Sequence, residues 1–125
     1  VSFVTVHIIP YWDDDPVGID EVIPYVDALY AEMQRRFPGK PVLIGETGWP
    51  SAGISFNNSI NTVENARSYF EAVRQWSLQR RVVAYYFEAI DEAWKSNRNA
   101  AVPPAAPWQG ARVALRRPRS PPRAR

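Results

Sequence analysis

The chain of 125 residues contains no cysteine and a single histidine, His7. The lack of cysteine excludes a disulfide framework and a thiolate metal site, and it leaves the redox compartment undetermined. One histidine without a second histidine, cysteine or serine partner forms neither a catalytic triad nor a metal site. We therefore expect no metal and no cofactor.

Long apolar runs are also absent, since none approaches the roughly 18 residues that span a bilayer. We therefore expect no membrane segment in this chain. The first residues, Val1 to Ile9, have the pattern of a strand and lack the basic region of a signal peptide. A chain that starts in mid-strand is expected to be a piece of a longer protein, and its compartment stays open.

Acidic residues are missing from residues 96–125, which contain 7 Arg and carry a net charge of +7. Residues 1–95 hold all 13 acidic residues and 8 Lys or Arg, which gives −5. The 96–125 segment is rich in Pro, Ala and Arg without a hydrophobic period, so we expect a disordered basic tail or the product of a misassembled reading frame. Clustered Arg also suits a nucleic-acid arm, but few aromatic residues accompany it, and we expect no nucleic-acid partner.

The most informative stretch is the apolar run Val42–Ile44, which leads into Gly45 and Glu46. It predicts a buried strand that ends in a carboxylate. Ligands bind at the carboxyl ends of strands in parallel α/β folds, although an acid that merely ends a strand at the surface is the commoner case. Two features favour a site: Gly45 and Gly48 leave room for close approach, and Trp49 offers a flat apolar face that suits a sugar ring.

Strand patterns flank this stretch at Val1–Tyr11 and Val82–Phe87. In the first strand, one parity carries Val4, Val6 and Ile8. The other parity carries the polar Thr5 and His7 with Ile9 and Tyr11, and in a barrel it faces the lumen. A histidine on a strand is more often a hydrogen-bonded core residue than a catalytic base. The acidic run at residues 13–15 lacks the alternate spacing of a calcium loop and is interpreted as a solvated loop.

Two helices are predicted between these strands from apolar residues at helical spacing. They are Val22, Val26, Leu29 and Met33 in the first helix, and Ala66, Tyr69, Phe70, Val73 and Trp76 in the second. Asp20 is the expected N-cap of the first helix, and Asn61 with Glu64 resembles a capping box for the second. Strand, helix, strand, helix and strand in succession are typical of parallel βαβ units. The expected core comprises Val4, Val6, Ile8, Leu29, Met33, Leu43, Ile44, Phe70 and Val83.

Three motifs occur in order along the chain. The first is His-Ile-Ile-Pro-Tyr-Trp at His7–Trp12, and the second is Gly-Glu-Thr-Gly-Trp-Pro-Ser-Ala-Gly at Gly45–Gly53. The third is Tyr-Phe-Glu-Ala-Ile-Asp-Glu-Ala-Trp-Lys at Tyr86–Lys95. Together they resemble glycoside hydrolase family 17, the β-1,3-glucanases and related β-glucan glucosyltransferases. The residues of the motifs are closer to those of the bacterial transferase branch than to those of the plant hydrolases.

The resemblance implies that residues 1–95 form strands six to eight, with their helices, of a partial (β/α)8 TIM barrel. It implies Glu46 as the catalytic nucleophile, supported by Tyr11. The substrate-binding residues that it implies are His7, Tyr11, Trp12, Trp49, Glu88, Glu92 and Lys95. The family's general acid is a Glu within an Asn-Glu pair at an earlier strand end, and this chain has no such pair at a strand end.

We therefore expect a fragment of a retaining β-1,3-glucan hydrolase or glucosyltransferase that is weak or inactive alone. Its expected partner is a β-glucan polysaccharide or oligosaccharide, and self-association through open sheet edges is a further expectation. The resemblance implies that the longer protein works in the periplasm, at a membrane or outside the cell. The alternatives are a non-catalytic glucan-binding module that uses Trp12, Trp49 and Trp94, and an inactive truncated gene product.

Overall fold

The computed structural model describes residues 2–11, 13, 16–53, 55–56 and 58–88. The expectations for Trp12, Glu92, Trp94, Lys95 and the 96–125 tail lie outside these residues. None of the helices in the described part is both long and apolar enough to cross a bilayer.

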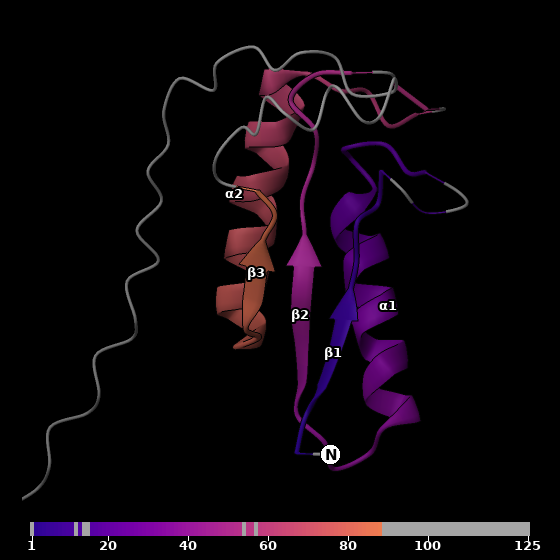
Figure 1. Ribbon diagram of the computed structural model, residues 1–125, viewed down its shortest axis with the longest axis vertical. Helices are drawn as coiled ribbons and strands as arrows, with labels where there is room; N and C mark the ends of the chain where they lie inside the picture. Colours follow the sequence, from indigo (N-terminus) through magenta and orange to yellow (C-terminus); the bar gives the residue numbers. More distant parts are fainter. Residues whose placement is uncertain (1, 12, 14–15, 54, 57, 89–125) are drawn as a thin grey trace, which may run out of the picture.

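Three parallel strands and two helices alternate within the described part of the chain, as the sequence predicts. They are β1 (Val4–His7), α1 (Val22–Arg36), β2 (Val42–Thr47), α2 (Val63–Arg80) and β3 (Ala84–Tyr86). The strands form one sheet in the order β1-β2-β3, with both pairs parallel (Figure 1). Both helices cover the same face of the sheet, which is the arrangement that two right-handed βαβ crossovers produce.

The core lies between the sheet and the two helices. Val22 and Val26 of α1 are buried there together with Tyr30, whose ring meets the Trp76 ring edge-on at 5.4 Å between centroids. The buried residues of α2 are Ala66, Tyr69, Val73 and Trp76. This confirms the predicted stripe of α2 except for Phe70, and that of α1 at Val22 and Val26. The predicted Phe70, Leu29 and Met33 are half-buried at the margin of the core.

The predicted helix caps are each wrong by one residue. The N-cap of α1 is Glu21 instead of Asp20, and its side chain makes no capping hydrogen bond. The N-cap of α2 is Thr62 instead of Asn61, because Thr62 takes the extended backbone conformation and its hydroxyl accepts from the Asn65 N–H at 3.0 Å. Serine, threonine, asparagine and aspartate all favour this position, so neighbouring candidates are not separated by residue type alone.

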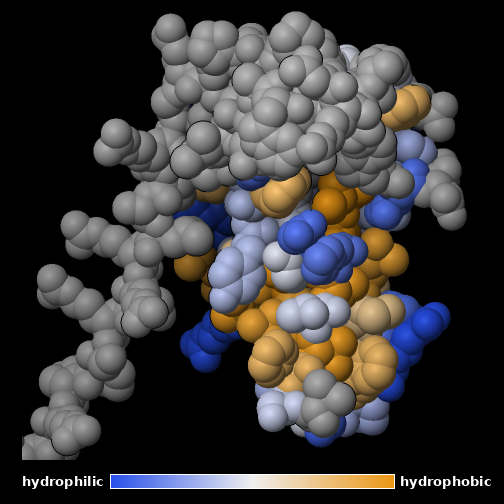
Figure 2. Space-filling model, in the orientation of Figure 1, coloured by the Kyte–Doolittle hydropathy of each residue, from blue (hydrophilic) through white to orange (hydrophobic). Residues whose placement is uncertain are grey.

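The face of the sheet that points away from the helices, here called the open face, is rich in apolar side chains (Figure 2). Tyr85 of β3 is exposed there, and so are the residues that adjoin the strand ends in the same alternation, Phe3, Val83 and Phe87. Val83 is 50% exposed, so its predicted place in the core is wrong. Strand alternation explains this, because Val82 and Ala84 are the residues that pack toward the helices.

Candidate active site

The carboxyl end of β2 contains an extra residue relative to both neighbouring strands. Along β1, Val6 pairs with Ile44 but His7 pairs with Glu46, which leaves Gly45 unpaired. Along β3, the register shifts in the same interval of β2, between Ile44 and Thr47. This irregularity is a β-bulge, which re-aims the side chains that follow it.

The bulge determines where Glu46 points. Strict alternation from Ile44, which is fully buried, would turn Glu46 toward the core. With the extra residue, Thr47 returns to the core with no exposed surface, while the Glu46 side chain stays 40% exposed. The carboxylate thereby avoids the large cost of burying an unpaired charge.

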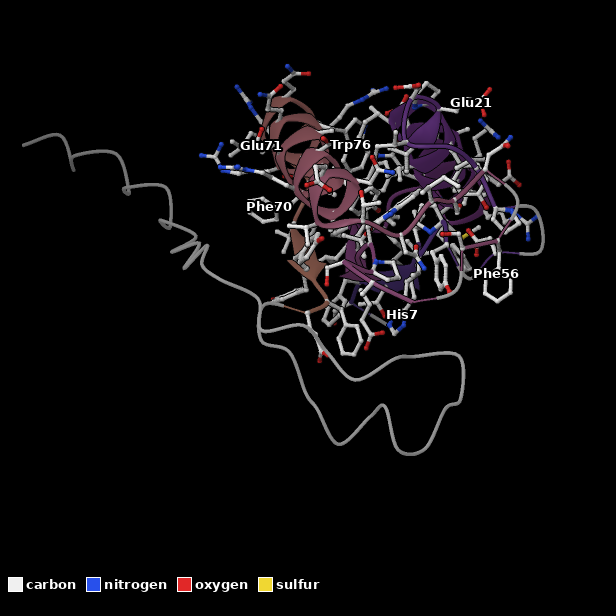
Figure 3. All side chains as sticks on the ribbon, turned by 90° about the horizontal axis from the view of Figure 1, so that it is seen from above. His7, Glu21, Phe56, Phe70, Glu71 and Trp76 are labelled. Atoms are coloured by element: carbon white, nitrogen blue, oxygen red, sulfur yellow. The ribbon has the colours of Figure 1, made fainter. Side chains whose placement is uncertain are left out.

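His7 lies directly beside Glu46. Its Nδ1 atom is 3.4 Å from Glu46 Oε2, and its side chain is 57% exposed. Figure 3 shows His7 on the side of the sheet opposite the helix residues Glu71 and Trp76. The interpretation of His7 as a core histidine is therefore wrong, because β1 turns this parity toward the open face.

The His7 ring rests over Gly45. A Cβ atom on Gly45 would lie 2.9 Å from His7 Nε2 and 3.0 Å from His7 Cδ2, and it would also lie 3.4 Å from Thr5 Cβ. The first two distances are shorter than ordinary van der Waals contact, so only a glycine leaves the ring its present place. The room for close approach that the sequence predicted at Gly45 is thus filled by His7.

On the core side of Glu46, a side-chain hydrogen bond links the end of β2 to α2. The hydroxyl groups of Thr47 and Tyr69 share a hydrogen bond, and both residues are fully buried. Burial raises the pKa of the Tyr69 hydroxyl above its ordinary range, although the hydrogen bond to Thr47 opposes the shift. This contact fixes the backbone next to Glu46 from the core side.

Trp49 belongs to the same support. It is 5% exposed, its indole N–H donates to the Ile60 carbonyl at 3.1 Å, and its ring centroid is 5.6 Å from that of Tyr69. The expectation of a flat exposed face beside Glu46 is therefore not met by Trp49 in this structure. Its indole is amphipathic, and here both its apolar and its polar parts are engaged within the fold.

The ends of β2 and β3 are held close to each other at Gly48. The Phe87 N–H donates to the Thr47 carbonyl at 2.7 Å, and a Cβ atom on Gly48 would lie only 1.8 Å from the Phe87 carbonyl oxygen. Glu88 follows as a half-buried residue at the carboxyl end of β3. Glu88 thus lies on the same edge of the sheet as Glu46 and His7.

Of the remaining predicted site residues, Tyr11 lies in the described part of the chain. Tyr11 is buried, with its ring 5.4 Å from that of Phe56. Trp12, Glu92 and Lys95 lie outside the described residues. Within the described part of the chain, His, Asp and Glu side chains form no group of three that could hold a metal ion.

The bulge and the His7–Glu46 contact are the features that sequence reasoning missed. The sequence signal for the bulge was the glycine between two apolar residues and the carboxylate, because a glycine inside a strand often marks a bulge. The contact requires the register between β1 and β2, which the residue pattern alone does not supply.

Comparison with solved structures shows a TIM-barrel-like α/β fold. The glycoside hydrolase family 17 β-1,3-glucanosyltransferase from Rhizomucor miehei is 37% identical with a TM-score of 0.71, and the match covers 76% of this chain and 35% of that one. An endo-laminarinase from Formosa supports the fold alone, at 22% identity and a TM-score of 0.62 over 81% of this chain and 33% of that one.

Comparison with curated proteins gives fungal relatives. A glucan 1,3-beta-glucosidase from Candida albicans is 46% identical over 56 residues, and its counterpart from Saccharomyces cerevisiae is 40% identical over 58 residues. These matches cover 42% and 43% of this chain, which spans only 17% of the length of either relative. Because these relatives are fungal, the expected relationship to the bacterial transferase branch is not confirmed.

The family of the BtgE/BtgC glycoside hydrolase domain matches residues 1–104. Together with the structural neighbours, this match confirms the resemblance to glycoside hydrolase family 17. The chain belongs to the BtgE/BtgC glycoside hydrolase domain family.

Proposed function

We propose that this chain supplies the nucleophile side of the active site in a retaining β-1,3-glucan hydrolase or glucosyltransferase. Residues 1–95 form strands six to eight of its (β/α)8 barrel, and residues 96–125 form a separate basic tail. The observation that carries the proposal is the bulge at Gly45, which turns Glu46 out of the core at the carboxyl end of the middle strand. Catalytic groups of such barrels come from this end of the strands.

In the proposed reaction, a carboxylate oxygen of Glu46 attacks the anomeric carbon and the glycosidic C–O bond breaks. The departing oxygen takes a proton from a second carboxyl group, which in retaining enzymes lies about 5–5.5 Å away. Water or a sugar hydroxyl then releases the glycosyl group from Glu46, which gives hydrolysis or transfer respectively. Glu88 lies at the same edge of the sheet, but it has a binding role in this proposal. The second carboxyl group therefore comes from another part of the barrel.

Without that acid, turnover of unactivated glucans by the isolated chain is slow. General acid–base assistance is commonly worth about 10²–10⁴-fold in rate. The substrate-binding role extends to His7, Tyr11 and Glu88, and beyond the described residues to Trp12, Glu92 and Lys95. Trp49 supports these groups from the core, through its hydrogen bond to Ile60.

A non-catalytic glucan-binding module is the second candidate. Exposed aromatic side chains on the open face favour it, since Tyr85 is 59% exposed and Phe87 is 45% exposed. Aromatic rings of this kind can stack on the C–H faces of sugars. This candidate shares the ligand with the first but predicts no covalent chemistry at Glu46.

The single histidine makes the glucan site directly observable by NMR, because the chain has one imidazole C2–H signal. We expect laminaritriose, the ligand in one Rhizomucor miehei glucanosyltransferase structure, to shift this signal saturably and to raise the thermal midpoint seen by near-UV circular dichroism. Cellotriose, with β-1,4 linkages, is the control and is expected to have a smaller effect.

A Glu71→Gln variant is the matched control for Glu46→Gln in this titration, since Glu71 is exposed on α2 far from the open face (Figure 3). We expect Glu71→Gln to bind laminaritriose like the unchanged chain and Glu46→Gln to change the response of the His7 signal. An unfolding curve and a His7 signal that are both insensitive to laminaritriose would contradict the proposed glucan site.

A further inference from the structure

Resting on the proposed function, we propose that His7 is a positioning residue that holds Glu46 Oε2 and so directs Oε1 toward the sugar. The Nδ1–Oε2 distance of 3.4 Å brings the imidazole within reach of that one oxygen. In this role His7 acts through Glu46 and does not itself exchange a proton with the substrate.

The placement of the His7–Glu46 contact sets it apart from the ion pairs between described residues. Glu32 pairs with Arg35 and Arg36 within α1, and Arg67 pairs with Glu71 within α2. Arg80 and Asp27 join the two helices. The His7–Glu46 pair is the one that joins two strands of the described sheet, and it does so at the carboxyl ends where the proposed site lies.

Two features of β2 hold the pair together. The bulge aligns Glu46 with His7 across the strands, and Gly45 provides the surface on which the ring lies. A side chain at position 45 would push the ring away, because its Cβ would be 2.9 Å from Nε2. The glycine is therefore part of the positioning device.

Positioning has a large effect on a nucleophile that is only half-buried. The Glu46 side chain is 40% exposed, so without a fixed partner its carboxylate can turn away from the attacking geometry. A misplacement of about 1 Å can cost on the order of 10²-fold in rate. A fixed contact on one oxygen restricts this rotation and leaves the other oxygen free to attack.

The experiment uses an activated reagent that needs no general acid, a 2-deoxy-2-fluoro-β-laminaribiosyl fluoride. A Glu46 oxygen forms a bond to its anomeric carbon while the C–F bond breaks and fluoride leaves with the electron pair. Intact-mass spectrometry of the full chain measures the rate of covalent labelling against reagent concentration. We expect His7→Ala to lower the limiting labelling rate at least about tenfold, a larger factor than the rise in the half-saturating concentration that loss of its binding role causes.

Three variants separate positioning from general damage to the fold. His7→Asn places an amide N–H near the former Nδ1 atom, and we expect it to restore a large part of the rate. Thr5→Ala lies on the same face of β1 and is the control, with labelling like that of the unchanged chain. Gly45→Ala should lower the rate as His7→Ala does, and the double change should lower it no further.

The outcomes distinguish this inference from the proposed function. Labelling of the unchanged chain but not of Glu46→Gln supports the nucleophile, whereas no labelling of the unchanged chain contradicts the proposed function itself. Labelling of His7→Ala at the unchanged rate overturns the positioning role and leaves the nucleophile in place. An equal loss in Thr5→Ala and His7→Ala, or a His7→Asn variant as slow as His7→Ala, also overturns it.

Discussion

The buried hydroxyl pair of Thr47 and Tyr69 makes a quantitative prediction about the support beneath Glu46. Neither residue has exposed surface. Thr47→Val leaves the Tyr69 hydroxyl buried without its partner, and Tyr69→Phe does the same to Thr47. Each change is expected to lower the free energy of unfolding by about 1–3 kcal/mol.

The double variant Thr47→Val/Tyr69→Phe is the decisive one. It removes both polar groups with little change of shape, so we expect it to cost less than the two single changes together, with a coupling of at least about 1 kcal/mol. Urea unfolding followed by far-UV circular dichroism gives these values if the slope stays constant. Tyr85→Phe removes an exposed hydroxyl, with Tyr85 59% exposed, and should lie within about 0.5 kcal/mol of the unchanged chain.

Additive losses in the double variant would contradict a coupling between the two hydroxyl groups. So would single variants as stable as the Tyr85→Phe control, because the Thr47–Tyr69 hydrogen bond would then contribute nothing to the fold.

Three further predictions follow from the packing and the pKa shifts. Gly48→Ala should destabilise the fold by at least about 1–3 kcal/mol in the same assay, because its Cβ would meet the Phe87 carbonyl oxygen, which belongs to the backbone. Asp27→Ala should cost about 1–3 kcal/mol, since the Asp27 carboxylate accepts from the buried Trp76 indole at 2.7 Å. That hydrogen bond is the main cause that lowers the pKa of Asp27, so its contribution is present near neutral pH and is lost below about pH 4 in acid titrations of stability. Burial raises the pKa of Tyr86 to about 12. The stability that the neutral Tyr86 hydroxyl contributes is therefore complete below about pH 10 and is lost as the pH rises toward 12. Tyr86→Phe should flatten this alkaline dependence of the urea midpoint.

The sequence was most informative where a periodic pattern met a turn residue. The run Val42–Ile44 before Glu46 predicted a buried strand that ends in a carboxylate, and the spacing of Ala66, Tyr69 and Val73 predicted the buried face of α2. These elements depend on local pattern and on burial, both of which the residue types encode.

The geometry around Glu46 depends on non-local register, and there the predictions were poorer. An aromatic residue beside a carboxylate suggested an exposed sugar platform, but Trp49 finds a hydrogen-bond acceptor in Ile60 and packs on Tyr69. Strand alternation placed His7 on the polar parity, whereas residue type favoured a core histidine, and in the structure its side chain is 57% exposed beside Glu46. The packing of Trp49 and the contact of His7 with Glu46 both depend on which segments are neighbours, and residue type does not supply this.

Mapping the covalent label from the fluorosugar identifies the carboxylate that acts as the nucleophile. Trypsin separates the residues 37–67 peptide, which contains Glu46 and Glu64, from the residues 82–95 peptide, which contains Glu88. Fragmentation within the first peptide then distinguishes Glu46 from Glu64. We expect a glycosyl ester on Glu46. A label on Glu88, on Glu64 or on no carboxylate would contradict Glu46 as the nucleophile.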